Sequence, residues 1–158
     1  MWRTKKMRRL AILALVLAFF AVLPCYGQRK TRIPQRKVVQ LTEPNVTGAM
    51  SLEETLAKRR SVRRFTNQAL KWAQIGQLAW AGQGITDRAR GLRTAPSAGS
   101  IYPIELFFAT PEGLYIYRPA EHSLEQLTDQ DVRLALAGRD GTASSIAEAG
   151  CDIIVAGS

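Results

Sequence analysis

The residues best suited to chemistry include a cluster of arginines in the first half of the chain. Residues 59–65 read Arg-Arg-Ser-Val-Arg-Arg-Phe, which places Arg59, Arg60, Arg63 and Arg64 around Ser61. A guanidinium group presents a planar fork of N–H donors that fits a phosphate, and the serine adds a hydroxyl. The same residues would also suit a cationic last turn that complements a helix dipole. The cluster therefore predicts a phosphate site or such a helix end.

A second segment combines small residues with prolines. Residues 93–105 read Arg-Thr-Ala-Pro-Ser-Ala-Gly-Ser-Ile-Tyr-Pro-Ile-Glu. Small residues between two prolines let the backbone approach a planar ligand closely, with amides and hydroxyls turned toward it. The alternative is an ordinary turn that leads into the following strand.

Two helices are predicted to position these segments. The first begins at Ser51, where Ser51 and Glu54 form a capping box, and runs to about 58–59 with Leu52 and Leu56 buried. The second covers about 70–81, because apolar residues recur at helical spacing. Those residues are Ile75, Leu78, Ala79 and Gly82, after which Gly84 helps to end the helix and residues 86–93 form a polar loop.

A β-hairpin follows the second segment. Residues 104–110 alternate as a buried strand, residues 110–113 fit a type I turn, and residues 114–117 return as the partner strand. Beyond it we predict a helix from Thr128 to about Ala137, a helix over 145–149 capped by Ser145, and a strand over 151–156. Because that last strand needs neighbours, we expect the chain to be the N-terminal part of a longer domain.

The first 27 residues are predicted to be a signal peptide. Five basic residues precede an uncharged apolar run from Leu10 to Leu23, and Cys25 and Gly27 suit a cut after residue 27. Fourteen helical residues span about 21 Å, which is short of the ~30 Å hydrocarbon core. We therefore expect an exported protein, periplasmic or extracellular. A signal anchor, a lipoprotein acylated at Cys25, and twin-arginine export through Arg8 and Arg9 are alternatives.

The net charge of +9 does not indicate a nucleic-acid-binding domain. Ten of the 22 basic residues precede residue 38, which leaves 12 basic and 13 acidic residues in the rest of the chain. A nucleic-acid-binding protein should carry its basic excess on the folded part, so we expect no such partner. Residues 28–50 are predicted to be a basic, extended linker. Its charges at 29–37 would suit weak contact with an anionic envelope surface.

Taken together, residues 59–63 and 93–105 resemble the nitroreductase family, and more closely its SagB-type branch of thiazoline- and oxazoline-oxidising dehydrogenases. The run Pro-Ser-Ala-Gly-x-x-Tyr-Pro is the most specific motif. Gln83-Gly84 and residues 113–117 also follow the pattern of this branch. The resemblance covers about residues 51–158, the expected nitroreductase-like domain.

The resemblance implies an α+β fold with helices packed on a central, mainly antiparallel sheet, incomplete here at the C-terminus. It also implies a homodimer that holds FMN between its subunits. Arg59 and Ser61 would bind the FMN phosphate and ribityl chain, with Arg60 beside them, and Arg63 would lie near the flavin N1/C2 edge. The cofactor-binding residues of the second segment would be Pro96, Ser97, Ala98, Gly99 and Ser100.

Two departures from the family pattern bear on cofactor binding. Ser100 stands where many relatives carry asparagine, and serine offers one short donor to the flavin pyrimidine edge where asparagine offers two groups. The C-terminal segments that complete the family's phosphate site are not in this sequence, so we expect this chain alone to bind FMN weakly or not at all.

The expected function is an FMN-dependent oxidoreductase that transfers hydride through flavin N5 to or from a small-molecule substrate, with no side chain as catalytic nucleophile. One alternative is a non-catalytic envelope protein that keeps the fold without flavin. Another is a module that adheres to the envelope through residues 29–37. No metal site is expected, because His122 is the only histidine, is expected at the surface, and Cys151 has no partner cysteine after cleavage.

Overall fold

The computed structural model describes residues 36–66, 68–138 and 144–157. They belong to one unit of contacts that begins at Arg36. The predicted signal peptide and most of the basic segment 29–37 lie outside the described residues and stay predictions. Within these described ranges, no helix is long and apolar enough to cross a membrane.

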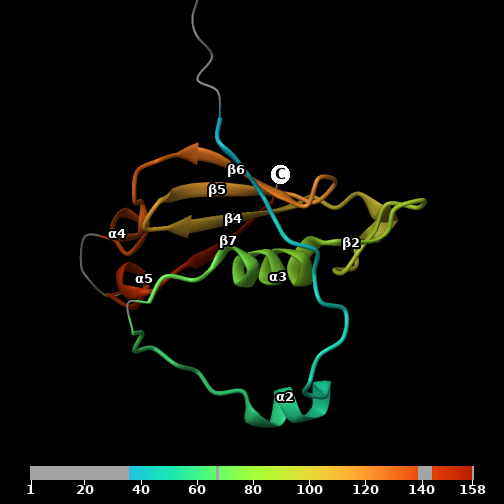
Figure 1. Ribbon diagram of the computed structural model, residues 1–158, viewed down its shortest axis with the longest axis horizontal. Coiled ribbons are helices and arrows are strands. Elements are labelled where there is room, and N and C mark those ends of the chain that lie inside the picture. Colours follow the sequence, from blue (N-terminus) through green and yellow to red (C-terminus); the bar gives the residue numbers. More distant parts are fainter. Residues whose placement is uncertain (1–35, 67, 139–143, 158) are drawn as a thin grey trace, which may run out of the picture. The chain divides into compact units, whose positions relative to one another are not determined.

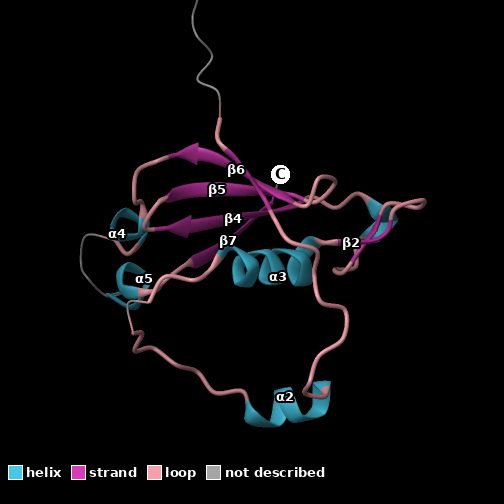
Figure 2. Ribbon diagram, in the orientation of Figure 1, coloured by secondary structure: helices cyan, strands magenta, loops and turns pink. Residues whose placement is uncertain are grey.

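An antiparallel sheet is the centre of the described structure, as Figure 1 and Figure 2 show. Its strands lie in the order β1, β6, β5, β4, β7, and every neighbouring pair is antiparallel. The strands are β1 (Val38–Gln40), β4 (Ile104–Thr110), β5 (Gly113–Arg118), β6 (Ser123–Thr128) and β7 (Asp152–Gly157). The predicted α+β class with a mainly antiparallel sheet is confirmed.

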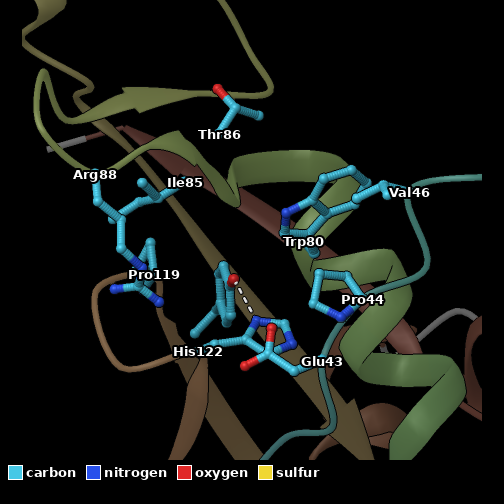
Figure 3. A pocket seen from close by; sticks show the side chains of 10 residues that line it. Glu43, Pro44, Val46, Trp80, Ile85, Thr86, Arg88, Pro119 and His122 are labelled. Atoms are coloured by element: carbon cyan, nitrogen blue, oxygen red, sulfur yellow. Dashed lines mark hydrogen bonds between the residues drawn. The ribbon is translucent and has the colours of Figure 1, made fainter.

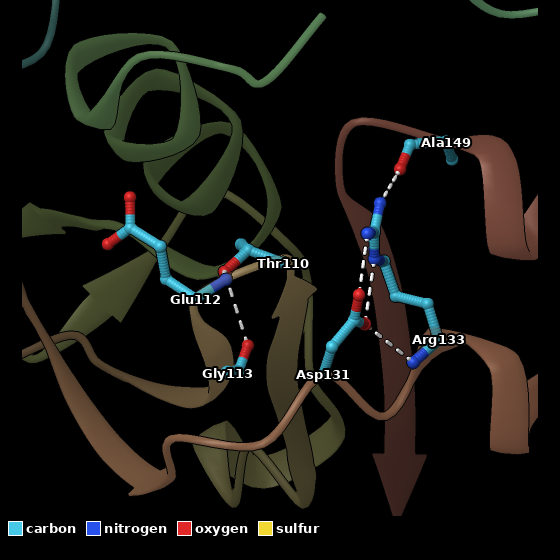
Figure 4. A network of polar contacts seen from close by, with 6 residues as sticks. All are labelled: Thr110, Glu112, Gly113, Asp131, Arg133 and Ala149. Atoms are coloured by element: carbon cyan, nitrogen blue, oxygen red, sulfur yellow. Dashed lines mark hydrogen bonds and ion pairs between the residues drawn. The ribbon is translucent and has the colours of Figure 1, made fainter. Parts of the chain in front are cut away.

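The predicted hairpin forms from β4 and β5. Thr110 pairs with Gly113 across its turn. The Thr110 hydroxyl accepts the N–H of Glu112 and donates to the carbonyl of Gly113, both at 3.2 Å (Figure 4). Gly113 has a φ of 132°, and a Cβ there would lie 2.1 Å from the carbonyl oxygen of Thr128. The turn therefore depends on glycine at position 113.

The segment after β5 corrects two predictions. It forms β6, a strand that the sequence pattern did not predict, and Leu124 on this strand is fully buried. Thr128 is the last residue of β6 and not a helix cap, so helix α4 is confined to Arg133–Leu136. Pairing with β5 and burial of Leu124 outweigh the local capping signal. Helix α5 spans Ser144–Glu148, so Ser145 lies inside the helix it was expected to cap.

The expected linker over residues 28–50 contains a strand. Val38–Gln40 forms β1 and pairs with β6, and the following Leu41 is 6% exposed within the core. Arg36 and Arg118 both donate hydrogen bonds to the carboxylate of Glu125, which joins the start of β1 to β5 and β6. These two guanidinium groups hold the pKa of Glu125 below its usual value. The folded unit therefore includes residues before position 51.

Helix α3 (Trp72–Gln83) covers one face of the sheet. Its buried residues include Ile75 and Ala79, as predicted, whereas Leu78 is 43% exposed and does not belong to the core. The core cluster is Leu41, Ile75, Ala79, Leu106, Phe108, Tyr115, Tyr117 and Leu124. Gly82 brings α3 close to β4, because a Cβ there would lie 2.7 Å from a methyl carbon of Leu106.

Helix α2 (Leu52–Lys58) begins as predicted, since the Ser51 hydroxyl accepts the N–H of Glu54 at 3.1 Å. The second hydrogen bond of a capping box would run from the Ser51 N–H to the Glu54 carboxylate. Here that carboxylate forms an ion pair with Lys58 instead. The prediction that Leu52 and Leu56 are buried is wrong, because they are 69% and 63% exposed. Figure 1 shows α2 apart from α3 and the sheet, and none of the residues of α2 is buried.

An arginine of α4 bonds to the residue that follows α5. The Arg133 guanidinium donates two hydrogen bonds to Asp131, at 2.9 and 2.7 Å, and a third to the carbonyl of Ala149 (Figure 4). Asp152, at the start of β7, has one buried carboxylate oxygen without a hydrogen-bond partner among the described residues. Burial raises the pKa of Asp152, and Arg133 partly offsets this effect.

Candidate functional site

The small-residue segment forms a tight turn with an unusual backbone. A short 3-10 helix covers Ala98–Ser100, and three residues have left-handed φ angles: Gly99 (62°), Ser100 (54°) and Tyr102 (49°). Glycine adopts this conformation freely, whereas at Ser100 and Tyr102 it needs support from neighbouring groups. The Tyr102 N–H donates to the Ser97 hydroxyl at 2.9 Å and provides part of that support.

The predicted site residues of this turn lie at the surface. Pro96, Ala98, Gly99 and Ser100 are exposed, and Ser97 is half-buried. Ile101 exposes 78% of its surface, although it is apolar. The turn therefore offers backbone groups, small side chains and one apolar side chain to a ligand or a second subunit.

Arg93 and Tyr102 hold the base of the turn. The Arg93 N–H donates to the Tyr102 hydroxyl at 3.2 Å, and the Arg93 guanidinium lies 4.6 Å from the centre of the Tyr102 ring. The guanidinium also donates to Gln83, the last residue of α3, at 3.2 Å. Next in the chain, Thr94 donates to the carbonyls of Trp80 (3.1 Å) and Gly84 (2.9 Å). The end of α3 thus serves as the support of the turn.

The loop predicted over residues 86–93 contains its own small hairpin. Strands β2 (Ile85–Asp87) and β3 (Leu92–Arg93) pair across a turn in which Asp87 accepts two hydrogen bonds from Arg90. These bonds lower the pKa of Asp87. The hairpin follows α3 in the chain and places Arg93 at the base of the turn formed by residues 97–102.

The arginine segment follows α2 directly. Arg59 is the C-cap of that helix, and the Arg60 guanidinium donates to the carbonyls of Ala57 (2.9 Å) and Arg59 (2.7 Å). Every residue from 59 to 66 is exposed. Among the described residues, none of the four arginines at 59, 60, 63 and 64 has an acidic partner. Their charges are available to an anion.

The two predicted segments do not meet within the single chain. No hydrogen bond or ion pair between described residues joins 59–65 to 96–100, and Figure 1 shows the stretch after α2 apart from the β2 region. The expectation that both segments bind the same cofactor therefore stays a prediction for the assembled protein.

His122 corrects another expectation. It was predicted at the surface, but it is 8% exposed and has a φ of 46°. Its Nε2–H donates to the carbonyl of Thr42 at 2.9 Å, because a carbonyl can only accept. In the neutral ring Nδ1 then accepts the Tyr117 hydroxyl at 2.9 Å. Burial raises the pKa of Tyr117 to about 12, although the charges of Arg93 and Arg88 oppose the shift.

His122 and Tyr117 are among the residues that line a hollow of about 310 Å³, and Figure 3 shows His122 in its wall. Its walls come from the segment after β1, the end of α3, the β2 region and the turn between β5 and β6. The remaining lining residues are Glu43, Pro44, Val46, Trp80, Ile85, Thr86, Arg88 and Pro119. Sequence reasoning missed this group because its members are scattered along the chain, and no local spacing signals a single histidine that bridges distant segments.

Comparison with known proteins places this fold in a family. The profile described as "Nitroreductase family" matches residues 56–158. A protein of Methanocaldococcus jannaschii named "Putative nitroreductase MJ1384" is 38% identical over 96 residues, which are 56% of this chain and 48% of that protein. The chain thus spans about half the length of this curated relative.

Solved structures agree with this family match. The crystal structure of a "putative nitroreductase" from Ralstonia eutropha JMP134 has a TM-score of 0.66 and 36% identity, and the match covers 75% of this chain and 54% of that one. A second, from Anabaena variabilis ATCC 29413, has a TM-score of 0.59 and 23% identity over 81% of this chain and 28% of that one, and shows the shared fold. The predicted nitroreductase-like fold is confirmed, and the chain belongs to the nitroreductase family.

Proposed function

We propose that the protein is an FMN-dependent oxidoreductase, and that it belongs to the SagB-type branch of its family. The observation that carries the proposal is the turn of residues 97–102, which exposes small residues in a supported left-handed conformation. The branch is supported by the motifs at residues 59–63, 83–84, 96–103 and 113–117.

The residues present fit the chemistry of the cofactor. A phosphate needs fixed positive charge and N–H donors, and the four exposed arginines after α2 have no acidic partner among the described residues. By the family resemblance, Arg59 and Ser61 hold the phosphate and ribityl chain, with Arg60 beside them. Arg63 supplies a positive charge at the N1/C2 edge of the ring.

The turn fits the planar part of the cofactor. Pro96, Ala98, Gly99 and Ser100 present little side-chain bulk, so a ring can approach the backbone closely. When bound, FMN supplies hydride transfer at N5. The chain's own contribution is to bind and orient the ring and to keep water from one of its faces.

We propose that a homodimer completes this site. Apolar side chains are exposed on α2 (Leu52, Leu56), after it (Val62) and on the turn (Ile101), at 69%, 63%, 64% and 78%. Contact between two copies would cover them and would bring an arginine segment near a turn. Light scattering should report a dimer that Leu52→Glu and Leu56→Glu dissociate, whereas a wild-type monomer contradicts the dimer.

The visible spectrum of the purified full-length protein tests the function. We expect a yellow protein that releases FMN on denaturation. Arg59→Gln should weaken FMN binding by roughly 10- to 100-fold, since a charge-assisted hydrogen bond is lost. Arg90→Gln is the matched control, because Arg90 is exposed and bonds only within its own turn to Asp87. A colourless protein that ignores added FMN would favour the alternative, a non-catalytic envelope protein with the same fold.

The proposed location is outside the cytoplasm, after cleavage of the signal peptide. Its support is the charged and apolar pattern of residues 1–27. Mature protein from the periplasm or medium should begin at Gln28, and a cytoplasmic protein that retains Met1 would contradict export. Weak binding of the basic residues 29–37 to an anionic envelope surface should decrease with salt.

A further inference from the structure

We propose that Arg93 is a positioning residue that sets the conformation of the turn through Tyr102. The proposal rests on the proposed function for the ligand that the turn receives. The contacts that carry it belong to this chain and need no cofactor. Arg93 is half-buried at the end of β3 and was not among the residues predicted to touch the cofactor.

Arg93 holds Tyr102 by two independent contacts. Its backbone N–H donates to the Tyr102 hydroxyl at 3.2 Å, and its guanidinium lies over the face of the same ring, 4.6 Å from the centre. A hydrogen bond at the tip of the ring and a cation over its face together fix both the position and the tilt of the side chain.

Gln83 fixes the guanidinium itself. The amide oxygen of Gln83 accepts a hydrogen bond from Arg93 at 3.2 Å, and Gln83 is 6% exposed at the end of α3. A buried amide has few other partners, so this bond ties Arg93 to the rigid helix. The contacts therefore run from α3 through Arg93 to Tyr102.

Tyr102 connects these contacts to the backbone of the turn. Its φ of 49° is a left-handed conformation that a tyrosine keeps only when its surroundings impose it. Its N–H donates to the Ser97 hydroxyl at 2.9 Å, which closes the turn over Ala98–Ser100. A loose Tyr102 side chain would release that constraint, and Gly99 and Ser100 would sample other backbone conformations.

The contacts explain why arginine stands at position 93. A planar guanidinium can stack on the ring and donate sideways to Gln83 at the same time. The compact ammonium of lysine can keep the charge near the ring but lacks the planar fork. Lysine should therefore retain part of the effect of the guanidinium, whereas an uncharged methionine should retain only the backbone hydrogen bond to the Tyr102 hydroxyl.

Hydrogen exchange and FMN titration of the full-length protein test the proposal. We expect Arg93→Met to raise amide exchange in residues 98–102 of the flavin-free protein about tenfold and to weaken FMN binding about tenfold. Arg93→Lys should recover part of both losses, and the visible circular dichroism of bound FMN should change with Arg93→Met. Arg90→Met is the matched control and should leave all three readouts unchanged.

Each result decides one point. Unchanged exchange in a folded Arg93→Met protein overturns the proposal. A faster-exchanging turn with unweakened FMN binding overturns the positioning role. If Arg93→Met does not fold, Tyr102→Leu decides, since it removes both the ring that the guanidinium covers and the hydroxyl acceptor, and unchanged exchange there also overturns the proposal. Wild-type protein that binds no FMN refutes the proposed function, while the exchange rates still test the link from Arg93 to the turn.

Discussion

Replacing His122 by phenylalanine tests how the segment after β1 is held to the sheet. Phenylalanine preserves a flat ring that can keep the edge contact with Tyr117, whose ring centre lies 5.8 Å from that of His122. It removes both ring nitrogens, and with them the hydrogen bonds to the Tyr117 hydroxyl and the Thr42 carbonyl. The change therefore isolates the polar contribution of the side chain.

The magnitude follows from the surroundings of the two lost partners. Tyr117 is 3% exposed, so its hydroxyl is left unpaired inside the protein, at a cost of about 2 kcal/mol. Thr42 is exposed, so its carbonyl can bind water and the loss there is about 1 kcal/mol. The free energy of unfolding should fall by about 3 kcal/mol, which is roughly 12 °C in Tm for a domain of this size.

Urea and thermal unfolding, followed by circular dichroism, measure this change. Tyr117→Phe should cost about 1–2 kcal/mol alone, and the double variant should cost about 1 kcal/mol less than the sum, because the two side chains share a bond. Thr42→Ala is the matched control: it keeps the carbonyl that His122 contacts, so stability should change by less than about 0.5 kcal/mol.

Two results would refute this reasoning. A loss below about 0.5 kcal/mol for His122→Phe would mean that the hydrogen bonds contribute no net stability. Strictly additive losses in the double variant would mean that His122 and Tyr117 do not interact in solution.

Three further predictions follow from the sheet and its ends. Gly113→Ala should destabilise the protein by about 2 kcal/mol or more, because a Cβ would lie 2.1 Å from the Thr128 carbonyl oxygen, and an unchanged Tm would contradict the turn geometry. Burial raises the pKa of Cys151 to about 11. Because the thiolate is the nucleophile, alkylation by iodoacetamide should be slow at neutral pH, rise about tenfold per pH unit and level off near pH 11, and fast reaction at pH 7 would refute the burial. Burial also raises the pKa of Asp152, so its stabilising effect is present below the unfolded pKa and lost as the pH rises through the folded pKa. Asp152→Asn should therefore raise Tm more at pH 7 than at pH 4, and an equal effect at both pH values would count against the raised pKa.

Local sequence patterns correctly predicted the elements that depend on residues close together in the sequence. The alternation of residues 104–110 and the turn before Gly113 gave the hairpin, and the cap at Ser51 gave the start of α2. They failed where pairing with a distant segment decides the structure. Residues 38–40 form a strand because β6 is available to them, and Thr128 continues β6 because β5 is beside it.

In the candidate site, too, the features set by neighbouring residues were predicted and those set by distant residues were not. The motif at 96–103 identified the turn, but no local pattern revealed that Gln83 and Arg93 support it or that Tyr102 adopts a left-handed backbone. Leu52 looked like a core residue because helical spacing reports an apolar face without stating what covers it. The two predicted segments do not meet within the described residues of this chain, and spacing along the sequence does not encode how they lie in space.

The pairing of β1 with β6 has a consequence for folding kinetics. The β4–β5–β6 meander can form from neighbours in sequence, whereas the ion pair between Arg36 and Glu125 joins residues 89 positions apart. Closing so long a loop carries a large entropic cost before any contact repays it. Strand β1 should therefore dock after the meander has formed and detach before it unfolds, exposing the Leu41 side of the core first.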